Sequence, residues 1–169
     1  AGMGEIQGIN QVLVSDITAI PTLEGWMYLA AFMGMKSRGI KGWCLRDHMR
    51  TELVEIAFNQ AMFRNKLPEG MIVHSDRGSQ YASHRFRALL KKNKAISSMS
   101  GKGNCYDNAA MESFWATLKK DLQITKPFKT KEEARLAIFD YIEVYYNRIR
   151  IHSSIGFMSP LDYEQKLCA

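Results

Sequence analysis

The chain has 169 residues, of which 46% are hydrophobic and 24% are charged, a balance that suits one globular domain and excludes a disordered chain. Its apolar stretches fall short of the roughly 18 residues that a membrane span needs, and the N-terminus lacks a cleavable signal pattern. Three cysteines without a Cys-x-x-Cys pair argue against a disulfide framework and a zinc ribbon. We therefore expect a cytoplasmic protein without membrane contact.

The formal net charge is +6, and the basic excess is confined to the middle of the chain. Residues 84–135 hold 12 lysines and arginines against five aspartates and glutamates, whereas residues 1–83 hold eight of each. A basic surface of this kind attracts a polyanion. Solvated helix faces give a similar count, so the composition points to a nucleic acid without deciding it.

The first predicted elements are strands. Residues 1–10 are predicted to be a flexible lead-in. Residues 12–18 then alternate between two faces with the period of a strand, and Asp16 shares one face with two valines. Two further β-rich runs, at 26–32 and 40–45, complete a predicted antiparallel meander of three strands.

The rest of the chain is predicted to alternate helices with short strands. Apolar spacings of three and four residues mark the helices, and Thr130 with Glu133 forms a capping box. We expect a helix from 51 to before Pro68, a strand at 71–74, a helix around 86–90, a strand near 95–96, a loop at 97–108, a long helix around 111–122 and a final helix after Thr130. This order predicts an α/β domain with a mixed sheet flanked by helices.

Three acidic residues are candidates for a shared site. Asp16 lies on the first predicted strand, Asp76 at the end of the fourth, and Glu112 in the first turns of the long helix. Carboxylates that converge at strand ends repel one another unless a divalent cation neutralises them. Oxygen ligands select Mg²⁺ or Mn²⁺ over zinc, and two such ions can support attack on a phosphodiester.

The number of residues between these acids does not by itself distinguish them from other acidic pairs in the chain. Thirty-five residues lie between Asp76 and Glu112, and the same gap separates two other pairs, Asp16–Glu52 and Asp107–Glu143. Local context favours Asp76, because an apolar strand precedes it and a polar turn follows it. The glutamates of the other two pairs lie among charges on predicted helices, where a solvated face explains them.

Neighbours of Glu112 suggest phosphate contacts. Lys119 follows Glu112 by seven residues, nearly two helical turns, so both project from one face. Asn108 precedes it by one turn and points the same way. His74, two residues before Asp76, is either a water- or phosphate-orienting group or a packed strand residue.

Several motifs together resemble a known family. They are Ser15–Thr18, His74–Tyr81, Gly103–Ala109, Glu112–Phe114 and Tyr146–Arg148, with His152 and Pro160 beyond them. In combination they resemble the catalytic core of bacterial insertion-sequence transposases of the IS-three group, which is similar to the retroviral integrase core. The resemblance runs from about residue 11 to about residue 165, leaving residues 166–169 as a tail.

The resemblance implies a ribonuclease-H-like fold with a five-stranded mixed sheet flanked by helices. It implies that Asp16, Asp76 and Glu112 form an Asp-Asp-Glu triad that holds two Mg²⁺ or Mn²⁺ ions. The implied activity is that of a polynucleotidyl transferase, which nicks double-stranded DNA at transposon ends and joins the freed 3′-hydroxyl to another phosphodiester. A bacterial, nucleoid-associated protein that acts at least as a dimer is expected.

Five residues are candidates for DNA contacts. Lys119 matches the group's basic residue after the glutamate and would contact donor-end DNA. The other candidates are Lys102, Asn108, Arg77 and Arg148. The chain departs from the group's pattern at Leu13, Gly34 and Lys36. These departures leave the three acids intact, and we expect them to alter the local packing of the first strands.

Two alternative functions stay open. One is a catalytically silent DNA-binding or dimerisation fragment of a transposase, which acids held far apart in the fold would favour. The other is a ribonuclease-H-like nuclease that cuts but does not join. Supplying a 3′-hydroxyl end and looking for joined product separates the nuclease from the transferase.

Overall fold

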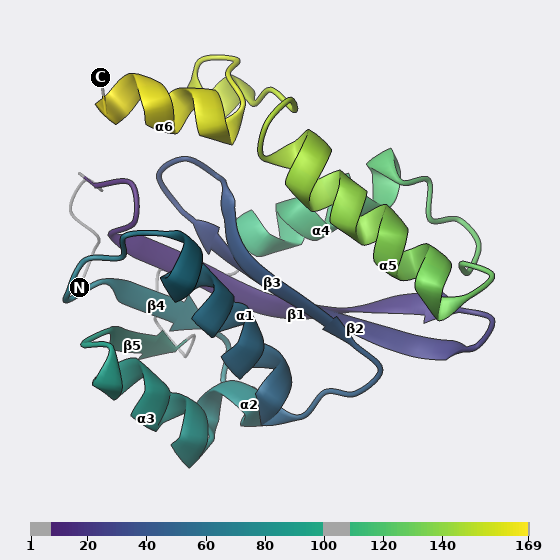
Figure 1. Cartoon of the computed structure of the whole chain (residues 1–169), viewed down its shortest axis with the longest axis horizontal. Coiled ribbons are helices and arrows are strands. Elements are labelled where there is room, and N and C mark those ends of the chain that lie inside the picture. The colour runs from purple at the N-terminus through teal and green to yellow at the C-terminus, as the bar shows by residue number, and fades with distance from the viewer. Residues whose placement is uncertain (1–7, 100–108, 169) are drawn as a thin grey trace.

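The computed structural model describes residues 8–99 and 109–168 and has a five-stranded sheet at its centre (Figure 1). The strands are β1 (Val12–Thr22), β2 (Gly25–Gly34), β3 (Ile40–Arg46), β4 (Ile72–Ser75) and β5 (Ile96–Met99), in the spatial order β3-β2-β1-β4-β5. β1, β2 and β3 pair antiparallel, whereas β4 pairs parallel with both β1 and β5. The predicted meander and the predicted mixed sheet are confirmed.

Helices pack against both faces of the sheet. They are α1 (Thr51–Arg64), α2 (Ser79–Ala82), α3 (His84–Lys92), α4 (Ala109–Asp121), α5 (Lys131–Phe139) and α6 (Pro160–Cys168), together with a π-helix η1 (Asp140–Tyr146) and a 3₁₀ helix η2 (Ser153–Ile155). No helix in the described part of the chain is long and apolar enough to span a bilayer.

Alternation along β1 divides the core into two apolar clusters. Leu13 points to the side of α1, α2 and α3, where it packs with Phe32 and Phe58. Val14 points to the opposite side, where α4 and α5 cover the sheet. Because successive strand residues face opposite sides, Asp16 shares the α4 side with Val14. The departures at Leu13 and Gly34 leave the strands in register, since these two residues are paired partners in the β1–β2 ladder.

The predicted loop at 97–108 is wrong at its start. Residues 97–99 belong to β5, because Ser97, Ser98 and Met99 pair with β4. Serines carry little strand signal, and backbone pairing with a neighbour that is remote in sequence forms this edge strand. The remaining residues of that predicted loop, 100–108, lie outside the described residues.

The last predicted helix also differs from the structure. Thr130 caps α5 as expected, since its hydroxyl accepts a hydrogen bond of 3.0 Å from the Glu133 amide, but α-helical bonding ends at Phe139 and η1 follows. A further helix, α6, comes after it, and residues 166–168, expected to form a tail, are its last residues. Its start signal was available, because Ser159 precedes a proline at the first helical position and caps the amide of Asp162 at 3.2 Å.

Two side chains of the Tyr146–Arg148 motif attach the C-terminal segment to the β2–β3 hairpin. The Asn147 amide accepts a hydrogen bond from the Ile40 N–H at 2.8 Å and donates to the Ile40 carbonyl at 3.0 Å, as a neighbouring strand would. The Tyr146 hydroxyl donates to the Arg38 carbonyl at 2.8 Å. This part of the motif therefore satisfies backbone groups at the edge of the sheet.

α6 is attached to the same hairpin through its Glu164. One carboxylate oxygen of Glu164 forms an ion pair with Lys41, whose side chain is buried. The other accepts a hydrogen bond of 2.9 Å from the hydroxyl of the buried Ser37. A buried ammonium requires a partner of this kind, so α6 and the hairpin are coupled.

The end of α4 is joined to η1 and to Arg150 through the carboxylate of Asp121. Asp121 accepts hydrogen bonds of 2.7 Å from the Tyr141 hydroxyl and 2.7 Å from Arg150 Nε. Burial acts to raise the pKa of Asp121, but the hydrogen bonds from Arg150 and Tyr141 outweigh it and hold the pKa below its ordinary value. The charged form of Asp121 is therefore the one that the fold stabilises.

We predict that Gly42→Ala destabilises the fold by roughly 3 kcal/mol, because added atoms in a packed region force neighbours apart. A Cβ at Gly42 would lie 2.2 Å from the carbonyl oxygen of Ala57 and 2.7 Å from the amide of Ala61, both backbone atoms of α1. Urea unfolding measures the change. Gly34→Ala is the control, since the nearest atom to its Cβ lies further away, at 3.1 Å, and belongs to the side chain of Lys41 and not to a backbone. An equal loss in both variants would contradict the prediction.

We predict that Asp121→Asn lowers stability at neutral pH and much less in acid. Since the folded-state pKa of Asp121 is depressed, its contribution is present above the unfolded pKa of about 3.9 and is lost as pH falls through the lower folded value. The difference in free energy of unfolding between the unaltered protein and the variant is therefore constant above about pH 5 and shrinks below about pH 4. Chemical denaturation across this range measures it. The exposed Asp140 provides the control variant, Asp140→Asn.

Candidate active site

The pairing of β4 with β1 brings two of the predicted acids to the same level of the sheet. Val14 pairs with His74 in the parallel β1–β4 ladder. Asp76 directly follows β4, and Asp16 lies two residues beyond Val14 on β1. The pairing therefore brings the end of β4 alongside the part of β1 that carries Asp16.

α4 is held across β1 by two side-chain hydrogen bonds. The Trp115 indole N–H donates to Asp16 Oδ2 at 3.1 Å, and Lys119 Nζ donates to Thr18 Oγ1 at 3.0 Å. Met111, Phe114 and Leu118 bury the adjacent face of the helix in the apolar cluster. Glu112 lies one helical turn before Trp115, on the flank that turns toward β1.

The charges of the three acids act on one another. Asp16 is half-buried, and burial raises its pKa. Hydrogen bonds from the Ile17 backbone and from Trp115 oppose this rise, while the negative charges of Asp76 and Glu112 add to it. The structure therefore brings Asp16, Asp76 and Glu112 into one neighbourhood from two strands and a helix.

These acids do not form a closed cage. Over residues 8–99 and 109–168, no group of three or more His, Cys, Asp and Glu side chains is gathered closely enough to hold a metal ion. Repulsion between like charges opposes a closer approach when no cation is present. The donors are all carboxylate oxygens, and this donor set suits Mg²⁺ or Mn²⁺.

The turn after β4 orients Asp76. Its Oδ1 accepts a hydrogen bond of 2.7 Å from the Gly78 amide. A Cβ at Gly78 would lie 2.9 Å from that same oxygen, so the carboxylate occupies space that only glycine leaves open. One oxygen of each aspartate is thus engaged by an N–H donor, the amide of Gly78 for Asp76 and the indole of Trp115 for Asp16.

A buried tyrosine supports the same two strands from the other face. Tyr81 is only 1% exposed, and its hydroxyl shares a hydrogen bond of 2.8 Å with Ser15 Oγ. Burial raises the pKa of Tyr81 well above its ordinary value, and the charges of Asp16 and Asp76 raise it further, so the phenol keeps its proton. Tyr81 and Ser15 belong to the quoted motifs, but sequence reasoning assigned them no role.

Sequence reasoning also assigned no polar role to Trp115, which lies within the predicted long helix around 111–122. The residue is buried in the apolar cluster, yet its N–H reaches Asp16. Its position three residues after Glu112, on the boundary of the apolar face, was the available signal, because a buried indole N–H needs an acceptor.

Of the other predicted site residues that the structure describes, Arg77 adjoins the acids and Arg148 lies apart from them. Arg77 is exposed and directly follows Asp76. Arg148 lies beyond the β3 edge, where its Nε donates to the Glu143 carbonyl at 3.1 Å and its side chain lines a cavity of about 200 Å³. Lys102 and Asn108 lie outside the described residues.

Two alternatives considered from sequence are decided by burial and contacts. His74 is fully buried, and its Nδ1 lies 3.0 Å from Ser98 Oγ on β5, so the packed-strand interpretation is confirmed. Glu143 accepts a hydrogen bond of 2.7 Å from the Trp43 indole and one from Arg64. It therefore joins β3, α1 and η1, away from the candidate acids.

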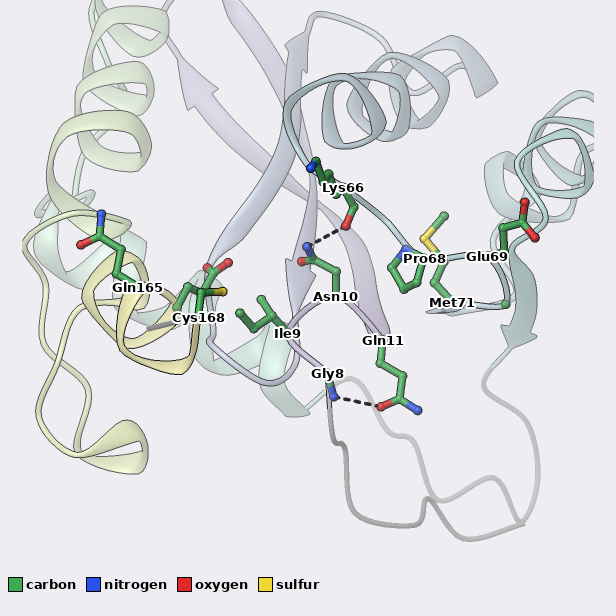
Figure 2. A pocket seen from close by; sticks show the side chains of 12 residues that line it. Gly8, Ile9, Asn10, Gln11, Lys66, Pro68, Glu69, Met71, Gln165 and Cys168 are labelled. Atoms are coloured by element: carbon green, nitrogen blue, oxygen red, sulfur yellow. Dashed lines mark hydrogen bonds between the residues drawn. The ribbon is translucent and has the colours of Figure 1, made fainter.

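A cavity of about 770 Å³ lies elsewhere on the molecule (Figure 2). Residues 8–11, the connection between α1 and β4, and α6 form its wall. Figure 2 shows Asn10 facing Lys66, with the Asn10 amide donating to the Lys66 carbonyl at 3.3 Å. The described residues that line it include none of the three candidate acids, so this cavity is separate from their site.

Both halves of the chain match family models that carry the same description. Residues 7–105 match one family model and residues 112–167 match a second, and both are described as an integrase core domain.

Two relatives are transposases. The transposase for insertion sequence element IS904 of Lactococcus lactis is 47% identical over 156 residues, which cover 92% of this chain and 62% of the relative. Transposase InsF for insertion sequence IS3A of Escherichia coli is 43% identical over 159 residues, covering 94% of this chain and 55% of the relative. The chain thus spans little more than half the length of these relatives.

The fold is shared with a solved integrase core. The catalytic core domain of HTLV-2 integrase, in complex with magnesium, superposes with a TM-score of 0.67 at 13% identity, covering 92% of this chain and 96% of that one. With the strand order described above, this similarity confirms the ribonuclease-H-like fold expected from the sequence.

We predict that Gly78→Ala weakens divalent-cation binding about tenfold, the usual scale for disturbing a group that orients a ligand. The added methyl displaces the Asp76 carboxylate, whereas the backbone at Gly78 (φ −55°, ψ 150°) accepts alanine without strain. Isothermal titration with Mn²⁺ measures the affinity, and thermal unfolding without metal is expected to change little. Ser79→Ala, at the next residue and the first of α2, is the control. Equal Mn²⁺ affinity in the two variants would count against the proposed fit between Gly78 and Asp76.

Proposed function

Because the chain belongs to the integrase core domain family, we propose that it is the catalytic core of a transposase that nicks DNA and transfers strands by in-line attack on phosphodiesters. The observation that carries this proposal is the placement of the three acids: Asp16 on β1 accepts a hydrogen bond from Trp115 of α4, the helix that also carries Glu112, and Asp76 directly follows β4, which pairs with β1. The relatives of 47% and 43% identity, both named transposases, support it. The core proper is proposed to be residues 11–165.

We propose that the three carboxylates bind Mg²⁺ or Mn²⁺, two ions in the active complex. Their all-oxygen donor set supports this choice, as does the magnesium in the HTLV-2 neighbour. When bound, such ions activate an attacking oxygen and stabilise the leaving oxygen of a phosphodiester. A cation would also neutralise the repulsion that raises the pKa of Asp16.

Each acid would contribute from a separately fixed element. Asp16 is held from the side of α4, and Asp76 is held by the turn that follows β4. Glu112 stands on the exposed flank of α4, a rigid helix whose apolar face is buried. Reacting groups placed on rigid elements avoid the entropy cost of being ordered at each turnover.

Basic side chains near the acids would bind the DNA backbone. Lys119 is half-buried and donates to Thr18, so its ammonium is directed along β1, where a donor-end phosphate could replace the hydroxyl as its partner. Arg77 is exposed beside Asp76 and is suited to a second phosphate. We further propose DNA contacts for Lys102 and Asn108, and for Arg148 on the separate surface beside β3.

The proposed partners are double-stranded DNA, comprising transposon ends and target, and a second copy of the chain. The dimeric form of the HTLV-2 neighbour supports an oligomer of at least two copies.

The test is strand transfer with Mn²⁺, using a labelled DNA that presents a 3′-hydroxyl end. Asp76→Asn should abolish joined product, because an amide cannot replace the charged ligand, while thermal unfolding shows that the variant is folded. Asp140→Asn, an exposed acid on η1, is the matched control and should join normally.

Other outcomes separate the alternatives. Cutting without joining by the unaltered protein would identify a ribonuclease-H-like nuclease. DNA binding with neither cutting nor joining would favour a catalytically silent fragment. Joining that survives Asp76→Asn would exclude the proposed site.

A further inference from the structure

The structure contains two buried or half-buried indoles that each donate to a carboxylate. Trp115 is 7% exposed and its N–H reaches Asp16 Oδ2 at 3.1 Å. Trp43 makes the same type of bond to Glu143 at 2.7 Å. Only Asp16 belongs to the proposed site. The Trp43–Glu143 bond therefore serves as a comparison, because it is the same type of contact away from that site.

Packing fixes the indole of Trp115 before it meets Asp16. Its ring lies 5.0 Å from the ring of Phe114, measured between centroids, within the apolar cluster that α4 forms with the sheet. An indole N–H is a donor only, so it can orient a carboxylate but cannot take a proton from it or ligate a cation. The same turn of α4 carries Glu112, and the position of Asp16 relative to Glu112 is thereby tied to one rigid element.

From this geometry we propose that Trp115 is a positioning residue for the metal site. Its N–H holds Asp16 Oδ2, so that the Asp16 carboxylate keeps a fixed orientation beside α4, the helix that carries Glu112. This inference rests on the proposed function, since it assumes that the three acids bind a divalent cation. It adds that Trp115, a residue of the apolar cluster around α4, donates a hydrogen bond to one of the proposed metal ligands.

The experiment compares Trp115→Phe with Trp43→Phe, each of which removes one indole N–H and keeps an aromatic ring. Free Mn²⁺ is counted by its electron paramagnetic resonance signal during titration of the protein. We expect about tenfold weaker Mn²⁺ binding in Trp115→Phe and unchanged binding in Trp43→Phe. In strand transfer, Trp115→Phe should need correspondingly more Mn²⁺, and saturating Mn²⁺ should restore most of the rate.

A second variant separates orientation from packing. Replacing Trp115 by β-(3-benzothienyl)alanine keeps the shape of the side chain and removes only the N–H. The same loss of Mn²⁺ affinity in this protein supports the inference even where Trp115→Phe unfolds.

The outcomes also distinguish this inference from the proposed function. Unchanged or tighter Mn²⁺ binding by the benzothienyl protein, with normal binding by the unaltered chain, would overturn the role of Trp115 alone. If the unaltered chain binds Mn²⁺ no better than Asp76→Asn, both the metal site and the role of Trp115 are overturned.

Discussion

The parallel pairing of β4 with β1 sets the register on which the candidate site depends. Val14 lies opposite His74, and this alignment brings the end of β4, which Asp76 directly follows, alongside the part of β1 that carries Asp16. A slip of one residue would turn the side chains of β4 to the opposite face of the sheet. The register is protected by the apolar side chains of both strands, since Leu13 and Val73 are buried in the cluster below the sheet.

The like charges gathered at the site therefore lower the stability of the folded protein. Burial and the neighbouring acids both raise the pKa of Asp16, which means that the charged form is disfavoured there. Apolar clusters on the two faces of the sheet hold the elements in place against this repulsion. A divalent cation bound as proposed above would relieve this repulsion.

The C-terminal segment shows how a polar motif can serve the fold. Tyr146 and Asn147 bind backbone groups of the β2–β3 hairpin, and Arg150 pairs with Asp121 at the end of α4. Because α4 carries Glu112 and Trp115, this segment supports the site from behind. Arg148 alone of the Tyr146–Arg148 motif is exposed, which makes it the member still free to contact a partner such as DNA.

Periodicity along the chain determined the order of strands and helices, the cap of α5 and the face of β1 on which Asp16 lies, because these are properties of neighbouring residues. The family resemblance named the three acids, whose spacing alone could not distinguish them from Asp16–Glu52. Only the tertiary structure decided that Ser97–Met99 form a strand, that η1 interrupts the last predicted helix, and that Trp115 donates to Asp16 across 99 residues. The strand pairing and the Trp115 hydrogen bond each depend on a partner remote in sequence, and pairing of that kind leaves no local pattern to read.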